Sequence, residues 1–137
     1  MSLEIIKDYA MRHVGLPYLW GGDDPLRGYD CSGFVQELLM ASGIDPIGDQ
    51  TAQGLYEWFY ARHVSRGAQL GALAFYGGDR VTHVAWCLSD RLIIEAGGGG
   101  SHTKNKEDAA NQNAFIRIRP LARRSDLKAV FMPRYNF

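Results

Sequence analysis

The sequence predicts an α+β fold in which N-terminal helices pack on one side of a mainly antiparallel sheet of about five strands. Helical patterns fill much of the chain before residue 63, whereas the runs after Gly71 are short, rich in β-branched and aromatic residues, and bounded by Gly, Asp, Asn or Pro. Helices followed by strands are typical of α+β domains, because each layer must bury its apolar face against the other. With 137 residues there is room for one core, so we expect a single domain over residues 1–137.

Apolar residues recur at helical intervals in the N-terminal half of the chain. The three segments concerned are residues 3–13, 31–41 and 51–62. Gly43 is suited to end the second helix, and Thr51 is suited to cap the start of the third. The glycines and Pro25 of residues 20–29 predict a loop that leads to Cys31.

Short runs with high β propensity make up the C-terminal half. They are residues 73–76, 81–88, 92–96, 115–118 and 130–132. Ser89-Asp90 is short enough to connect the second and third runs as a hairpin. Residues 97–113 begin with four glycines and contain few apolar side chains, so they predict a mobile loop.

Acidic and basic side chains cancel at fifteen each, which argues against nucleic acid or an anionic membrane as the main partner. No apolar run reaches the roughly 20 residues of a membrane helix, so no membrane span is expected. Residues 1–7 lack the pattern of a signal peptide. Compartment and oligomeric state stay open, since a phage-encoded protein, an injected toxin and a domain excised from a longer exported protein all fit.

The chain has only two cysteines, Cys31 and Cys87, whereas a small domain stabilised by disulfides normally has more. We therefore expect two free thiols. No C-x-x-C or H-x-x-x-H pair is present, and no metal site is predicted. Cys87 lies in a predicted strand and is expected in the core.

Cys31 lies in the sequence Asp30-Cys31-Ser32-Gly33, at the first turn of a predicted helix. The positive end of a helix dipole and its free N–H groups stabilise a thiolate there. A lone cysteine is otherwise often a small buried hydrophobe, but a turn residue and a glycine beside it favour exposure. We therefore predict that Cys31 is a nucleophile.

Histidine is the side chain most suited to take the thiol proton. The candidates are His13, His63, His83 and His102. His83 is favoured because it lies within an apolar strand, where an imidazole needs a hydrogen-bond partner; strand alternation puts Val81, His83 and Ala85 on one face. Two of the others lie at helix ends, where they have structural explanations, and His102 in the glycine-rich loop is kept only for contact with substrate.

Five motifs follow one another along the chain. They are GLPYLWGG at residues 15–22, DCSGF at 30–34, Thr51-Ala52-Gln53, GALAF at 71–75 and His83-Val84-Ala85. In this order and at these separations they resemble the motifs of the NlpC-type cell-wall peptidases of the papain-like superfamily. The resemblance covers most of the chain and implies a papain-like fold.

By position, the resemblance implies that Cys31 is the nucleophile, His83 the general base and then acid, and Tyr18 a hydroxyl donor near the oxyanion. The backbone N–H of Cys31 or Ser32 would supply a second donor. The family usually has His, Asn or Gln about twelve residues after the base, where this chain has Glu95. A carboxylate can orient an imidazole as Asp does in serine triads, so we predict Glu95 as the third catalytic residue.

Two further features bear on the resemblance. Ala72 stands where the family commonly has Asp, which we expect to alter turn chemistry rather than catalysis. The nucleophile precedes the base, as in papain-like peptidases; the permuted acyltransferase relatives have the reverse order, so lipid acyl transfer is not expected. Trp20 lies beside the expected cleft, with packing as its main role.

The resemblance implies hydrolysis of an amide bond in a bacterial peptidoglycan stem peptide, such as the bond from D-γ-glutamyl to a diamino acid. The partner would be that stem peptide or a related small peptide, and no metal or organic cofactor is implied. Two alternatives stay open. One is a non-catalytic binding or structural module, for example a phage tail component that retains the fold; the other is an amidase or transpeptidase acting on another peptide.

Overall fold

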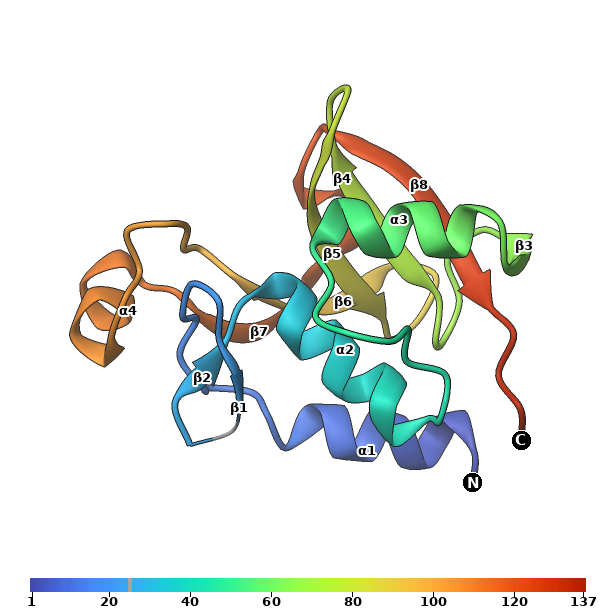
Figure 1. Ribbon diagram of the computed structural model, residues 1–137, viewed down its shortest axis with the longest axis horizontal. Coiled ribbons are helices and arrows are strands. Elements are labelled where there is room, and N and C mark those ends of the chain that lie inside the picture. The colour runs from blue at the N-terminus through green and yellow to red at the C-terminus, as the bar shows by residue number, and fades with distance from the viewer. Residues whose placement is uncertain (25) are drawn as a thin grey trace.

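The computed structural model describes residues 1–24 and 26–137, and it sets three helices on one side of a twisted sheet, the second and third against the sheet and the first against the second (Figure 1). These helices are α1 (Leu3–Met11), α2 (Cys31–Ala41) and α3 (Ala52–Tyr60). Each begins after a polar side chain that accepts a hydrogen bond from a first-turn N–H: Ser2, Asp30 and Thr51. The prediction of three N-terminal helices is confirmed.

Within the described residues the main sheet has six strands, in the order β3-β8-β4-β5-β6-β7, and every neighbouring pair is antiparallel. The strands are β3 (His63–Arg66), β4 (Leu73–Gly77), β5 (Val81–Cys87), β6 (Leu92–Gly97), β7 (Phe115–Pro120) and β8 (Leu127–Pro133). Five of them match the predicted runs. The sixth, β3, escaped prediction because it is short and mostly exposed, so it lacks an apolar pattern.

The larger core cluster lies between the helices and the sheet and includes Phe34, Trp86 and Phe131, all fully buried. A smaller cluster, which includes Ala85 and Cys87, forms on the other face. Val81 packs in the larger cluster, so the prediction that it shares a face with Ala85 is wrong. A β-bulge between the pairs Tyr76–His83 and Gly77–Val81 shifts the alternation.

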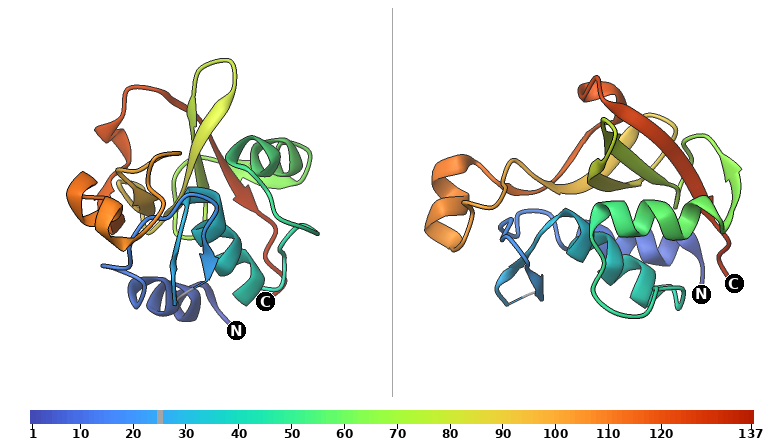
Figure 2. Two further views of the ribbon diagram at one scale, coloured as in Figure 1. Left: turned by 60° about the vertical axis from the view of Figure 1, so that its left-hand side comes forward. Right: turned by 45° about the horizontal axis from the view of Figure 1, so that its top comes forward.

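Two segments expected to be loops contain regular structure. Residues 97–113 include α4 (Lys106–Gln112), which projects at the end of the molecule opposite the termini (Figures 1 and 2). Asn105 caps this helix by accepting a hydrogen bond from the Asp108 N–H, a signal that the glycine run obscured. Residues 20–29 contain the small antiparallel pair β1 (Asp23–Asp24) and β2 (Gly28–Tyr29); Pro25 lies outside the described residues.

Strands β5 and β6 are paired at Trp86–Ile94 and Cys87–Ile93, next to their connection, which is longer than the two-residue turn expected. Toward His83 and Gly97 no further pair is formed in the described sheet, so the two strands part there. The chain termini lie side by side in all views (Figures 1 and 2). No helix among the described residues is both long and apolar enough to cross a membrane.

Candidate active site

The N-terminus of α2 fixes the position of Cys31. The Asp30 carboxylate accepts hydrogen bonds from the N–H of Gly33 at 2.7 Å and from the N–H of Gly21 at 3.1 Å, so it ties the helix start to the preceding loop. The loop packs so closely that a Cβ on Gly33 would collide with the carbonyl oxygen of Gly22. This contact explains why residue 33 is a glycine.

His83 and Glu95 face each other where β5 and β6 part. The imidazole Nε2 lies 2.7 Å from Glu95 Oε1, and the Arg119 Nε lies 3.8 Å from Glu95 Oε2. Burial favours a neutral Glu95, but the His83 hydrogen bond and the nearby Arg119 outweigh burial and lower its pKa. Glu95 is therefore an ionised acceptor, and His83 donates from Nε2.

The other imidazole nitrogen, Nδ1, remains for Cys31. Burial alone would lower the His83 pKa, but hydrogen bonds with Cys31 and Glu95 raise it to about 9. Cys31, His83 and Glu95 thus line one cavity, where the carboxylate holds Nε2 of the imidazole and the thiol is near enough to help raise its pKa. This is the arrangement in which an imidazole takes a proton from a thiol and the resulting imidazolium is stabilised.

Two cavities meet at the thiol. The smaller, about 240 Å³, is lined by His83 and Glu95, and the larger, about 480 Å³, by the loop before α2 and the start of α3. Cys31 and Tyr18 line both. Desolvation and the nearby Cys31 raise the pKa of the Tyr18 hydroxyl, so it stays a proton donor at neutral pH.

The N–H groups of Cys31 and Ser32 belong to the first turn of α2, before intrahelical hydrogen bonds begin. They are available to an oxygen atom held above the sulfur. Ser32 lines the larger cavity, and its hydroxyl lies 3.4 Å from Asp30 Oδ1. The structure therefore brings together all five side chains predicted for the site: Tyr18, Cys31, Ser32, His83 and Glu95.

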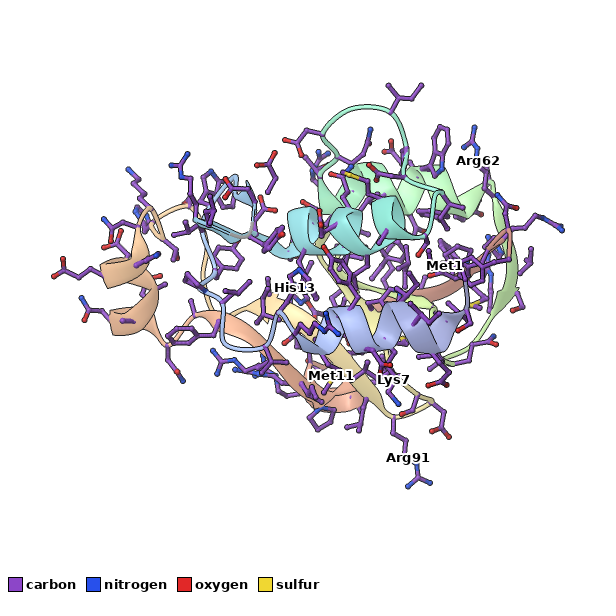
Figure 3. The ribbon with its side chains drawn as sticks, turned by 90° about the horizontal axis from the view of Figure 1, so that it is seen from below. Met1, Lys7, Met11, His13, Arg62 and Arg91 are labelled. Atoms are coloured by element: carbon purple, nitrogen blue, oxygen red, sulfur yellow. The ribbon has the colours of Figure 1, made fainter. Side chains whose placement is uncertain are left out.

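The remaining histidines lie elsewhere. His13 is buried near the end of α1, where its Nδ1 bonds the Tyr9 carbonyl (Figure 3 labels His13). His63 in β3 bonds the Phe59 carbonyl in the same way. His102 is exposed and lines neither cavity at the thiol.

Cys87 is fully buried in the smaller core cluster, and burial raises its pKa to about 12, so it is an unreactive thiol. Trp20 is 59% exposed at the rim of the larger cavity. The expectation that Trp20 mainly packs in the core is therefore wrong; the indole is accessible to a ligand in this cavity. The described residues contain no cluster of three or more His, Cys, Asp or Glu able to hold a metal ion.

Several residues of the smaller cavity were not singled out from the sequence. They are Thr82, Gly97, Gly98, Gly99, Arg123 and Arg124. The glycine run was a usable signal, because a Cβ on Gly99 would collide with the Tyr18 ring. The two arginines gave none, since they reach the cavity from the short 3₁₀ turn η1 (Leu121–Arg123) and the residue after it, far from any motif.

Comparison with known proteins gives matches over most of the chain. The bifunctional muramidase/DL-endopeptidase CwlT of Bacillus subtilis is 33% identical over 98 residues, which is 71% of this chain and 30% of that protein. The peptidoglycan endopeptidase RipA of Mycolicibacterium smegmatis is 31% identical over 116 residues, covering 75% of this chain and 22% of that protein. The chain thus spans less than a third of either relative.

An NlpC/P60 family protein from Bacillus cereus has the same fold, with a TM-score of 0.73 and 22% identity over 98% of this chain and 40% of that one. The profile of the NlpC/P60 family matches residues 15–120, a range that contains Tyr18, Cys31, His83 and Glu95. On the strength of that match, the chain belongs to the NlpC/P60 family.

Proposed function

We propose that this chain is a cysteine peptidase that hydrolyses an amide bond in peptidoglycan stem peptides, between a D-γ-glutamyl residue and a diamino acid. The observation that carries the proposal is the group of Cys31, His83 and Glu95 at the meeting point of two cavities. The names of the relatives, a DL-endopeptidase and a peptidoglycan endopeptidase, support the substrate class.

In the first step His83 Nδ1 holds the thiol proton and the Cys31 sulfur attacks the amide carbonyl carbon. The donors for the developing oxyanion are the Tyr18 hydroxyl and the first-turn N–H groups of Cys31 and Ser32, a role supported by the cavity that these three residues line together. Glu95 stabilises the imidazolium through Nε2. The imidazolium then protonates the leaving amine, the C–N bond breaks and a thioester forms on the sulfur.

In the second step a water molecule attacks the thioester carbonyl, and neutral His83 accepts its proton. The thiolate leaves, the acyl half departs as a carboxylic acid, and the imidazolium–thiolate pair is restored. His83 thus acts as acid in one half of the cycle and as base in the other, and the carboxylate of Glu95 favours the charged form in both.

Defined stem peptides test the proposal. The wild type should release the diamino acid portion from L-Ala-γ-D-Glu-diamino acid peptides, as read by mass spectrometry, and Cys31→Ala should abolish release. Cys87→Ala is the matched control, because that thiol is fully buried in a separate cluster; it should keep full turnover. Intact peptides after incubation with a correctly folded wild type would contradict the assignment and favour a non-catalytic module or another peptide substrate.

A further inference from the structure

The two cavities at the thiol are not equivalent for a substrate. The imidazole must protonate the leaving amine, so the residue that supplies this amine has to lie on the imidazole side of the sulfur. His83 lines the smaller cavity of about 240 Å³ and is absent from the lining of the larger one. The smaller cavity is therefore the place for the leaving-group half of the substrate.

This leaving-group cavity carries positive charge. Arg123 and Arg124 line it together with the ionised Glu95, whose negative charge is offset by His83 and Arg119. The larger cavity has the opposite character, since its charged lining residues are Asp30, Asp49 and Arg80. A substrate that lies across the thiol therefore meets a basic end beyond the imidazole and a more acidic end before it.

The three arginines differ in whether they already form ion pairs within the protein. Arg124 makes a two-point pair with Asp126, at 2.9 Å from Nε and 2.7 Å from the terminal nitrogen, and it lies over the Tyr76 ring. Arg119 pairs with Glu95. In the part of the chain that the structure describes, none of the ion pairs involves Arg123, although it is close enough to Glu95 to help lower that carboxyl's pKa.

We infer that Arg123 binds a carboxylate at the end of the side chain of the residue that supplies the leaving amine, and so selects a diamino acid whose side chain ends in a carboxylate over one whose side chain ends in an amine alone. This rests on the proposed function. The diaminopimelate side chain ends in a carboxylate beside its ammonium group, whereas the lysine side chain ends in an ammonium group alone, which the excess positive charge repels. A guanidinium suits this task because its planar fork matches a carboxylate.

Three peptides separate this carboxylate from all other features: L-Ala-γ-D-Glu linked to diaminopimelate, to diaminopimelate whose side-chain carboxylate is amidated, and to L-lysine. We expect the wild type to give its highest kcat/KM with the free acid. Arg123→Ala should reduce the preference for acid over amide by roughly fivefold, the effect of losing a partly exposed ion pair. Arg123→Glu should remove it entirely and favour the lysine peptide.

Arg62→Ala is the control, because Arg62 lies at the end of α3 on the edge of the molecule and lines a different cavity (Figure 3); it should keep the wild-type preference. Equal turnover of acid and amide by the wild type, or a preference that survives both Arg123 variants, would overturn the inference.

Binding to the Cys31→Ala protein, measured by calorimetry, keeps the two proposals separate. If the wild type cleaves none of the peptides, the proposed function fails and binding decides the inference. Tighter binding of the acid than of the amide, lost when Arg123→Ala is added, supports the carboxylate site. Equal binding of both rejects it.

Discussion

Glu95 brings a full negative charge to a position where an amide or a second imidazole would supply only a dipole. At 2.7 Å from the His83 Nε2 it favours the charged imidazolium, and Arg119 keeps the carboxylate itself ionised. The His83 pKa of about 9 reflects this together with Cys31. The site thus holds its imidazole protonated over a wider pH range than a free histidine would allow.

Replacing Glu95 should expose this dependence. Glu95→Ala removes a charge-assisted hydrogen bond, so we expect kcat/KM to fall about 10- to 100-fold. Glu95→Gln keeps an acceptor and should lose less. In both variants the His83 pKa should fall, as NMR titration of the imidazole would record. Glu4→Ala on exposed α1 should change neither quantity. An unchanged His83 pKa in Glu95→Ala would remove Glu95 from the site.

A substitution at Gly99 tests the role of Tyr18. A Cβ there would collide with the Tyr18 ring and lie 2.7 Å from the Thr103 Oγ1, so Gly99→Ala should displace Tyr18. We expect kcat to approach the roughly 10²-fold loss that removal of one oxyanion donor causes. A Cβ on the neighbouring Gly100 would meet no atom within 4 Å, so Gly100→Ala should keep full turnover. Equal rates for the two variants would argue against a role for Tyr18.

At this scale the sequence was informative where chemistry is local. Cys31 could be found because a helix start and a flanking Gly33 are both visible in the sequence. Glu95 could be named only through the family resemblance, which implies an imidazole-orienting residue about twelve positions after His83. Arg123 could not, because its place in the cavity depends on how η1 packs against the sheet, and no residue near it in sequence signals that contact.

Among the elements, α2 matters most because its first turn carries the thiol. Asp30 caps this turn and also holds Gly21, so its side chain links helix stability to the position of the sulfur. Ser2 caps α1 by the same kind of bond, to the Ile5 N–H, but far from the cavities. The two caps therefore form a matched pair for experiment.

We expect Asp30→Ala and Ser2→Ala each to lower the free energy of unfolding by about 1 kcal/mol in urea titrations. Only Asp30→Ala should also lower kcat, because the first turn that holds Cys31 loses its two anchors. Asp30→Asn keeps the acceptor and should restore most of the rate. Loss of stability without loss of rate in Asp30→Ala would show that the sulfur is positioned by other contacts.

Helices and strands could be predicted where one buried face imposes a regular spacing of apolar residues. They were missed where no such face is buried. The helices α1, α2 and α3 each bury one face, so their apolar residues recur at helical intervals that can be recognised in the sequence. Helix α4 buries only Ala109, so its cap was the single available sign. The bulge that turns Val81 toward the helices arises from pairing with β4, which no local pattern encodes.

For the molecule as a whole, the ion pair of His83 with Glu95 makes the free energy of unfolding depend on pH. The His83 pKa is about 9 in the folded protein against 6.5 for a free histidine, so folding favours the protonated form. This contribution is fully present below pH 6.5 and is lost as the pH rises through about 9. The free energy of unfolding, measured from pH 6 to 9.5, should therefore fall more for the wild type than for His83→Gln; parallel curves would contradict the raised pKa.

The same architecture has a use that follows from where its ends lie. Because the N- and C-termini are neighbours and line a surface hollow distant from the thiol, both ends can be joined to a host loop with little separation to bridge. A chimera made in this way would carry the chain on two adjacent connections, and the join would involve none of the residues that line the two cavities at Cys31. Inserted into a host protein that binds a chosen surface, this chain could be delivered to that surface without changes to its core.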